Sequence, residues 1–188
     1  MGSKIPSLND TLTNFIAAQK IYFVGTAANE GSVNVSPKGM NSLRVLSPTR
    51  VAWLNVTGSG NETAAHLLDN TRMTIMFCAF EGTPMILRLY GQARAIHQGD
   101  ADWAEMAALF EPLPGARQIF DLSIELVQTS CGMAVPYYTY DEDRSLLKEW
   151  ALKKGDAGIE QYWEAKNQTS LDGKPTLIVE KSRRPLEQ

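Results

Sequence analysis

The residues best suited to hold an anion lie in a glycine turn between an expected strand and an expected helix. Residues 51–57 alternate with the period of a strand, and a helical pattern follows the turn. Gly58 and Gly60 permit backbone angles that a side chain would forbid. Ser59 with Glu62 fits a capping box, and the unpaired N–H groups of a helix start can bind a phosphate. Taken alone, the turn is compatible with a plain capped turn, which is the commoner case, and with a phosphate site; it matches neither a Walker loop nor the Rossmann glycine spacing.

A hydroxyl and an ammonium group are expected side by side on an earlier strand. Residues 21–27 and 33–36 are rich in strand formers, and a turn at residues 29–31 joins them, which predicts a hairpin. If the second strand continues as far as Lys38, the side chains of Ser36 and Lys38 share one face. Both groups can donate to an anion. The alternative for Lys38 is a solvated loop charge.

A long expected strand at residues 85–96 carries two different faces. One face is small and apolar, and the other presents Arg88, Tyr90, Gln92 and Arg94. Such a strand is typical of a barrel wall that also contacts a partner or ligand. The alternative is that its arginines pair with carboxylates across a dimer interface.

Composition narrows the class of protein. The chain has 188 residues, 44% of them hydrophobic, which suffices for one domain with one sizeable core. Its net charge of −3 argues against general binding to nucleic acids or membrane surfaces. With two histidines and no C-x-x-C pair, no metal site is expected. We expect Cys78 and Cys131 to be reduced thiols in a cytoplasmic protein, and we expect no secretory or membrane-spanning segment.

The remaining pattern supplies the elements that must position these residues. Strands are expected at residues 21–27, 33–36, 51–57, 72–80, 85–96 and 120–126. Helices are expected at residues 8–18, 64–70, 100–110, 143–154 and 156–166. About six strands at hairpin-like spacing, with helices between and after them, predict a small antiparallel barrel decorated by helices.

Several motifs, in this order along the chain, resemble the pyridoxamine 5′-phosphate oxidase-related FMN-binding split-barrel family. They are residues 33–39, the turn at 57–63 with Ala65–His66–Leu67, the strand at 72–80, Arg88–Gly91, and Ser130–Pro136 with its Ser-Cys-Gly-x-x-Val-Pro pattern. The resemblance covers roughly residues 10–178. It implies a mainly β (α+β) fold, a six-stranded antiparallel split β-barrel with peripheral helices. We expect one domain over 1–188, with the barrel at about 20–136, a helical extension at about 142–168 and a loose tail at 181–188.

The resemblance also implies a cofactor and a partner. In that family two barrels pair as a homodimer, and each FMN lies in the cleft between the subunits. Lys38 then approaches the flavin or its phosphate, Arg88 reaches across to the FMN of the other subunit, and Cys131 borders the flavin ring. The cofactor-binding residues implied are Ser36, Lys38, Thr57, Gly58, Ser59, Asn61, Arg88 and Cys131.

The chain also departs from the family pattern. Members that oxidise pyridoxamine phosphate place an Arg-Lys pair after the Gly-Ser of the turn, where Gly60, Asn61 and the acidic Glu62 follow here. They also use a C-terminal Arg and His, whereas no histidine follows His97. We expect an FMN-dependent oxidoreductase whose small-molecule substrate is not pyridoxamine phosphate and whose catalytic residues are not identified. The alternatives are a flavin carrier or sensor without turnover, or a split barrel that binds deazaflavin or haem.

Overall fold

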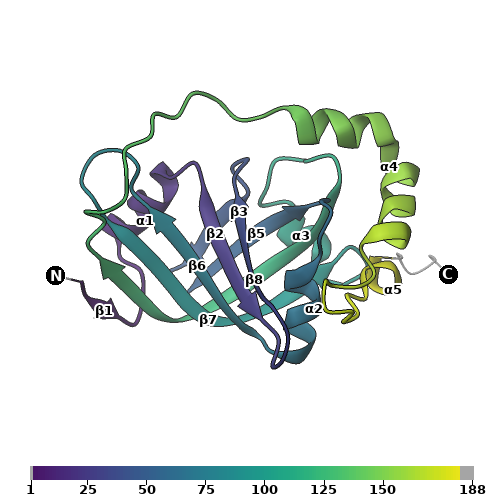
Figure 1. The fold of residues 1–188 in the computed structure, drawn as a ribbon, viewed down its shortest axis with the longest axis horizontal. Coiled ribbons are helices and arrows are strands. Elements are labelled where there is room, and N and C mark those ends of the chain that lie inside the picture. The colour runs from purple at the N-terminus through teal and green to yellow at the C-terminus, as the bar shows by residue number, and fades with distance from the viewer. Residues whose placement is uncertain (1, 183–188) are drawn as a thin grey trace.

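Eight antiparallel strands form one curved sheet in the computed structural model, which describes residues 2–182 (Figure 1). Their order is β3-β2-β6-β7-β8-β5-β4, with β1 paired to β8. The bounds are β1 Lys4–Ile5, β2 Tyr22–Ala27, β3 Val33–Lys38, β4 Leu43–Ser47, β5 Arg50–Val56, β6 Arg72–Cys78, β7 Ile86–His97 and β8 Ala116–Ser130. Since β3 and β4 are the two ends of this order, the sheet is not closed. The mainly antiparallel β fold with helices is confirmed, with β1 and β4 added to the six expected strands.

Five helices accompany the sheet in the described part of the chain. Their bounds are α1 Asp10–Ala18, α2 Glu62–Asp69, α3 Trp103–Ala107, α4 Leu146–Lys166 and α5 Ile178–Ser182. Figure 1 shows α1 toward one end of the barrel and α2 with α5 toward the other. Within residues 2–182, none of these helices combines the length and the apolar character that crossing a membrane requires.

The β2–β3 hairpin fixes the direction of the side chains on β3. Tyr22 pairs with Lys38 and Val24 with Ser36, and residues directly opposite each other share one face of a sheet. Tyr22 and Val24 belong to the buried core, so Ser36 and Lys38 also point toward the barrel interior. The strand continues through Pro37, which lacks a backbone N–H, and an edge strand tolerates this because one of its sides has no neighbouring strand to donate to.

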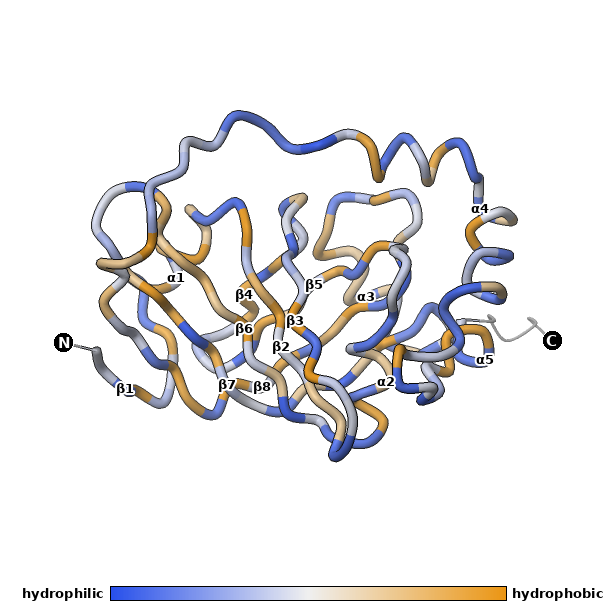
Figure 2. The backbone as a smooth tube through the Cα atoms, viewed as in Figure 1, coloured by the Kyte–Doolittle hydropathy of each residue, from blue (hydrophilic) through white to orange (hydrophobic). Residues whose placement is uncertain are grey.

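The barrel core is built from side chains of β2 and β5–β8. At its centre Trp53 stacks on Phe120 with 4.6 Å between ring centroids, and both are fully buried. A separate apolar cluster joins α4 to α5 through Ile159, Trp163 and Ile178. Figure 2 shows the hydrophobic residues concentrated along the barrel strands, whereas the long connection from β8 to α4 is largely hydrophilic. The C-terminal extension therefore has its own small core against the barrel.

Two glycines mark irregular points in the chain. At Gly91 a β-carbon would collide with the carbonyl oxygen of Ser123, so the bulge between β7 and β8 requires a residue without a side chain. Gly155 has φ 65° and divides α4 into two halves, which correspond to the two helices expected at 143–154 and 156–166. Of the loose tail expected at 181–188, Lys181 and Ser182 belong to α5, and residues 183–188 lie outside the described residues.

Candidate functional site

A cavity of about 220 Å³ opens where β3, β5 and the start of α2 meet. This position lies at the split of the barrel, beside the edge strand β3. Five of the residues predicted from the sequence line it: Ser36, Lys38, Gly58, Ser59 and Asn61. The structure thus brings the inward face of the hairpin and the glycine turn to one place.

Lys38 is half-buried at this cavity. Its Nζ lies 5.1 Å from the centre of the Trp53 ring, a cation–π contact with a side chain that is itself fully buried. Burial and, secondarily, repulsion by Arg117 lower the pKa of Lys38 to about 8. The solvated loop charge considered from the sequence is therefore wrong for this lysine.

Arg117, on β8, is a second cation at the cavity and was not predicted. It is 3% exposed, and its Nη1 donates to Oδ1 of Asn167 at 2.7 Å while Nη2 donates to the carbonyl of Gly60 at 3.0 Å. Its Nε has no partner in the described part of the chain. Burial lowers the pKa of Arg117 to about 10. The alternation in the sequence predicted β8 from residue 120 only, so Arg117 fell outside the expected strand.

The charge of these two cations is not neutralised by nearby carboxylates. Among residues 2–182, neither Lys38 nor Arg117 forms an ion pair. Glu62 also lines the cavity, but its Oε2 accepts a hydrogen bond of 2.9 Å from the N–H of Leu171. The two positive charges, one buried and one half-buried, thus contact neutral groups, an arrangement that an external anion would stabilise.

The glycine turn delivers further donors to the same cavity. Helix α2 begins at Glu62, so its N-cap is Asn61. The expected capping box of Ser59 with Glu62 is wrong, because Ser59 lies two residues before the N-cap and the Glu62 carboxylate bonds to Leu171. Asn61 is 3% exposed, and its Oδ1 has no partner in the described residues. The donors are the N–H groups of Ser59, Gly60 and Glu62, for which the described residues supply no acceptor, so the N-terminus of α2 with its partial positive charge can bind a ligand.

The other three predicted residues lie elsewhere. Thr57 is buried behind the turn, where its hydroxyl donates to the carbonyl of Gly115 and accepts from the indole N–H of Trp163, each at 2.8 Å. Arg88 lies on the outer face of the sheet, on the side opposite to its buried neighbours on β7, and donates to Ser130 at 3.1 Å. Cys131 is an exposed free thiol just after β8.

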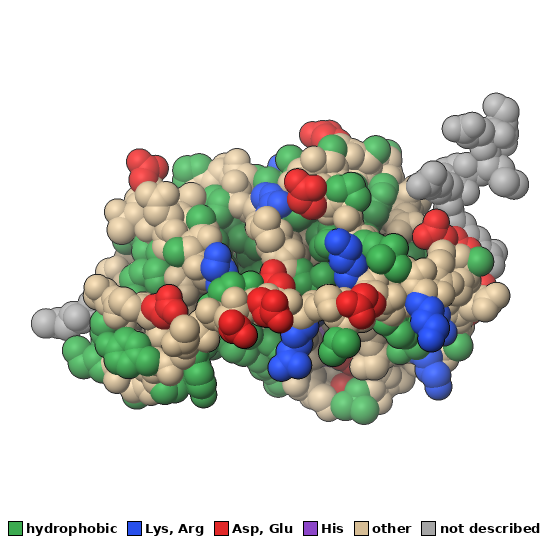
Figure 3. All heavy atoms as spheres, turned by 90° about the horizontal axis from the view of Figure 1, so that it is seen from above, with side chains coloured by type: hydrophobic (Ala, Val, Ile, Leu, Met, Phe, Trp, Pro, Cys, Tyr) green, Lys and Arg blue, Asp and Glu red, His purple; other side chains and the backbone are tan. Residues whose placement is uncertain are grey.

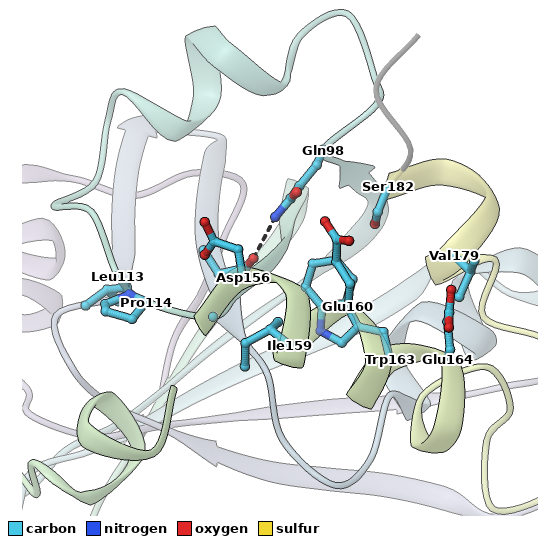
Figure 4. A pocket seen from close by; sticks show the side chains of 12 residues that line it. Gln98, Leu113, Pro114, Asp156, Ile159, Glu160, Trp163, Glu164, Val179 and Ser182 are labelled. Carbon is cyan, nitrogen blue, oxygen red and sulfur yellow. Dashed lines mark hydrogen bonds between the residues drawn. The ribbon is translucent and has the colours of Figure 1, made fainter. Parts of the chain in front are cut away.

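A larger cavity, of about 610 Å³, lies between the barrel and the C-terminal helices (Figure 4). Asp156, Glu160 and Glu164 line it, four residues apart along α4. These carboxylates make it unsuited to a phosphate. Basic and acidic side chains are interspersed on the face drawn in Figure 3, so this face is not a continuous basic surface. Among the described residues, no three His, Cys, Asp or Glu side chains gather as metal ligands would.

Comparison with known proteins adds the family context. A family model described as pyridoxamine 5′-phosphate oxidase matches residues 8–131. The pyridoxamine 5′-phosphate oxidase family protein ustO of Aspergillus flavus is 37% identical over 191 residues, spanning 91% of this chain and 76% of that protein.

Solved structures agree on the fold. A histidine-to-alanine variant of the HupZ protein of Group A Streptococcus aligns with a TM-score of 0.53 and 18% identity over 65% of this chain and 98% of its own. A Clostridium acetobutylicum protein related to general stress protein 26 aligns with a TM-score of 0.52 and 15% identity over 64% of this chain and 86% of its own. The C-terminal extension lies beyond the segment that the family model matches.

Proposed function

This chain belongs to the pyridoxamine 5′-phosphate oxidase family, and we propose that it binds FMN and acts as a flavin-dependent oxidoreductase on a small organic molecule. The observation that carries the proposal is the pair Lys38 and Arg117, whose charges no carboxylate neutralises among the described residues. A phosphate dianion matches this donor set, because charge-assisted hydrogen bonds from lysine, arginine and helix N–H groups are the strongest that such a group forms.

The proposal gives a role to each predicted residue at the cavity and to Arg117. Lys38 and Arg117 neutralise the phosphate, and the hydroxyls of Ser36 and Ser59 donate to its oxygens or to the ribityl chain. The N–H groups from Gly58 to the start of α2 complete the cradle, with Asn61 at the helix end. Thr57 acts indirectly, since its hydroxyl anchors the end of β5 to the C-terminal helix.

The cavity holds only part of FMN. Its volume of about 220 Å³ lies below the range of roughly 300–1,000 Å³ found for pockets that enclose a drug-sized ligand. Lys38 faces the barrel interior and Arg88 the outer face of the sheet, so one chain cannot direct both toward the same molecule. We therefore propose a homodimer in which Arg88 and Cys131 of one chain border the FMN bound by the other.

Bound flavin supplies the electron-transfer chemistry, and the protein supplies position and electrostatics. Gly60 and Asn61 occupy the places where relatives that oxidise pyridoxamine phosphate carry the Arg-Lys pair. We accordingly propose a different substrate. Nicotinamide oxidation distinguishes an enzyme from a flavin carrier without turnover.

The visible spectrum of the purified protein tests the proposal. We expect flavin absorption, release of the cofactor on heating, and a mass identifying it as FMN at close to one per chain. A colourless protein that also fails to bind added FMN would contradict the proposal. Sedimentation at micromolar concentration tests the dimer, and a monomer alone would contradict the shared site.

A further inference from the structure

Asn167, at the end of α4, is the residue through which the C-terminal extension contacts the cationic cavity. It is fully buried, and its side chain and carbonyl together take part in five hydrogen bonds. Two of them involve its main-chain carbonyl, which accepts from Thr176 at 2.6 Å and from Asn61 at 3.3 Å. The other three involve its amide group and reach the residues that line the cavity.

The amide nitrogen of Asn167 orients the glycine turn. Its Nδ2 donates to the carbonyls of Gly58 at 3.0 Å and Ser59 at 3.3 Å. In a trans peptide the N–H points opposite to the C=O, and the described chain contains no cis peptide. The N–H groups of Ser59 and Gly60 therefore point away from Asn167. Gly58, Ser59 and Gly60 line the cavity and Asn167 does not, so we infer that these donors face the cavity.

The amide oxygen of Asn167 holds Arg117 without neutralising it. Oδ1 accepts from Nη1 of Arg117 at 2.7 Å and, being neutral, fixes the guanidinium while leaving its positive charge available. A carboxylate of the same shape would form an ion pair with Arg117. It would also be unable to donate to Gly58 and Ser59, so an asparagine satisfies requirements that an aspartate does not.

We propose that Asn167 is the positioning residue of the phosphate site, so that the C-terminal extension is a working part of this site rather than a structural appendage. The inference rests on the proposed function for the identity of the cofactor, but its physical content is the affinity for a phosphate group. It adds a residue beyond the segment 8–131 that the family model matches.

The test compares Asn167→Asp and Asn167→Ser with the wild-type protein and with Gln168→Ala. Gln168 is the adjacent, exposed residue, whose side chain donates only to the carbonyl of Glu164 among the described residues. For each protein the affinities for FMN, riboflavin and inorganic phosphate are measured by titration on cofactor-free protein. Circular dichroism confirms that each variant is folded.

We expect Asn167→Asp to lower the affinities for FMN and inorganic phosphate by roughly ten- to a hundredfold and the affinity for riboflavin much less, because the charged hydrogen bonds to the phosphate are lost. Asn167→Ser is expected to change in the same direction, and it decides the question if the aspartate variant does not fold. Gln168→Ala is expected to match the wild type. If Asn167 had a merely structural role, its substitution would lower the affinities for FMN and riboflavin alike.

The outcomes separate the two proposals. If wild type and Asn167→Asp bind FMN and phosphate equally, the role of Asn167 is overturned and the FMN proposal stands. If the wild type binds phosphate but no flavin, the FMN proposal fails and the phosphate affinities alone decide the role of Asn167. Wild-type protein that binds neither overturns both.

Discussion

Two groups of basic side chains in this molecule differ in whether carboxylates of the same chain pair with them. On the outer side of the sheet, two arginines donate to Asp121, Arg50 at 2.8 Å and Arg94 at 3.1 Å. Arg94 also pairs with Asp102 at 2.6 Å. Burial alone would raise the pKa of Asp121, but the hydrogen bonds and charges of the two arginines outweigh it and hold that pKa below its usual value. These cations are neutralised by carboxylates of the same chain.

At the split of the barrel, Lys38 and Arg117 are more deeply buried yet meet only neutral groups among residues 2–182. Leaving a buried charge uncompensated costs stability. The contrast teaches that this chain pairs the outer cations with its own carboxylates and leaves Lys38 and Arg117 unpaired at the cavity, where we propose that a ligand supplies the negative charge. The pairing considered from the sequence for Arg94 is found, within the chain itself rather than across an interface.

The largest effect is expected from removing the open charge itself. Arg117→Met is expected to lower the affinity for FMN by about a hundredfold or more, because the phosphate loses a charged donor that is itself buried. The stability of the ligand-free protein is expected to change little, since an uncompensated charge disappears along with two hydrogen bonds. Titration with FMN and chemical denaturation measure the two effects. Unchanged FMN affinity would remove Arg117 from the site.

Disrupting the ion pairs of Arg50 and Arg94 is expected to affect stability rather than FMN affinity. Asp121→Asn is expected to lower the free energy of unfolding by about 2 kcal/mol, because Arg50 and Arg94 lose their shared partner while remaining partly exposed to water. FMN affinity is expected to stay within about twofold of the wild type. A stable variant with impaired FMN binding would reverse the distinction between the two groups.

The pH dependence of FMN affinity tests the role of Lys38. The anion requires the protonated amine, whose pKa in the free protein is about 8. As the pH rises through this value, binding must also take up a proton, so FMN affinity is expected to fall by roughly 25-fold between about pH 7.5 and 9.5. Lys38→Arg keeps its charge in this range and is expected to abolish the fall. A wild-type profile as flat as that of the variant would show that Lys38 does not contact the phosphate.

The smallest effect concerns the ligand-free protein. The folded-state pKa of Lys38 lies below the ordinary value of 10.5, so the unfolded chain binds more protons between about pH 8 and 10.5. The contribution of Lys38 to the free energy of unfolding therefore rises with pH in that window, by on the order of 1 kcal/mol. Denaturation at about pH 8 and pH 10 is expected to show this rise in the wild type and not in Lys38→Met. An equal pH dependence in both proteins would contradict the burial of this charge.

Local patterns in the sequence predicted the longer strands and helices and five of the residues that line the cavity. Period-two alternation placed Ser36 and Lys38 on one face of β3, and the strand, turn and helix signals around Gly58 located the turn that lines the cavity. The two short strands β1 and β4 were not counted, because two to five residues carry little periodicity.

The rest of the site depends on contacts between residues far apart in the chain. Arg117 meets Gly60 across 57 positions, and Asn167 meets Gly58 across 109, and no local period encodes such pairs. The sequence also left a conflict between the charge of Glu62 and a phosphate at the same helix end. In the structure the Glu62 carboxylate lines the cavity and accepts a hydrogen bond from the N–H of Leu171, another contact between residues far apart in the chain.

The central claim is that the cavity of Lys38 and Arg117 binds the phosphate of FMN, and the most direct test compares FMN with riboflavin, which differ by that group alone. On cofactor-free wild-type protein at about pH 7, we predict that FMN binds at least about a hundredfold more tightly than riboflavin. Equal affinities for the two flavins would mean that the cavity does not hold the phosphate and would contradict the account.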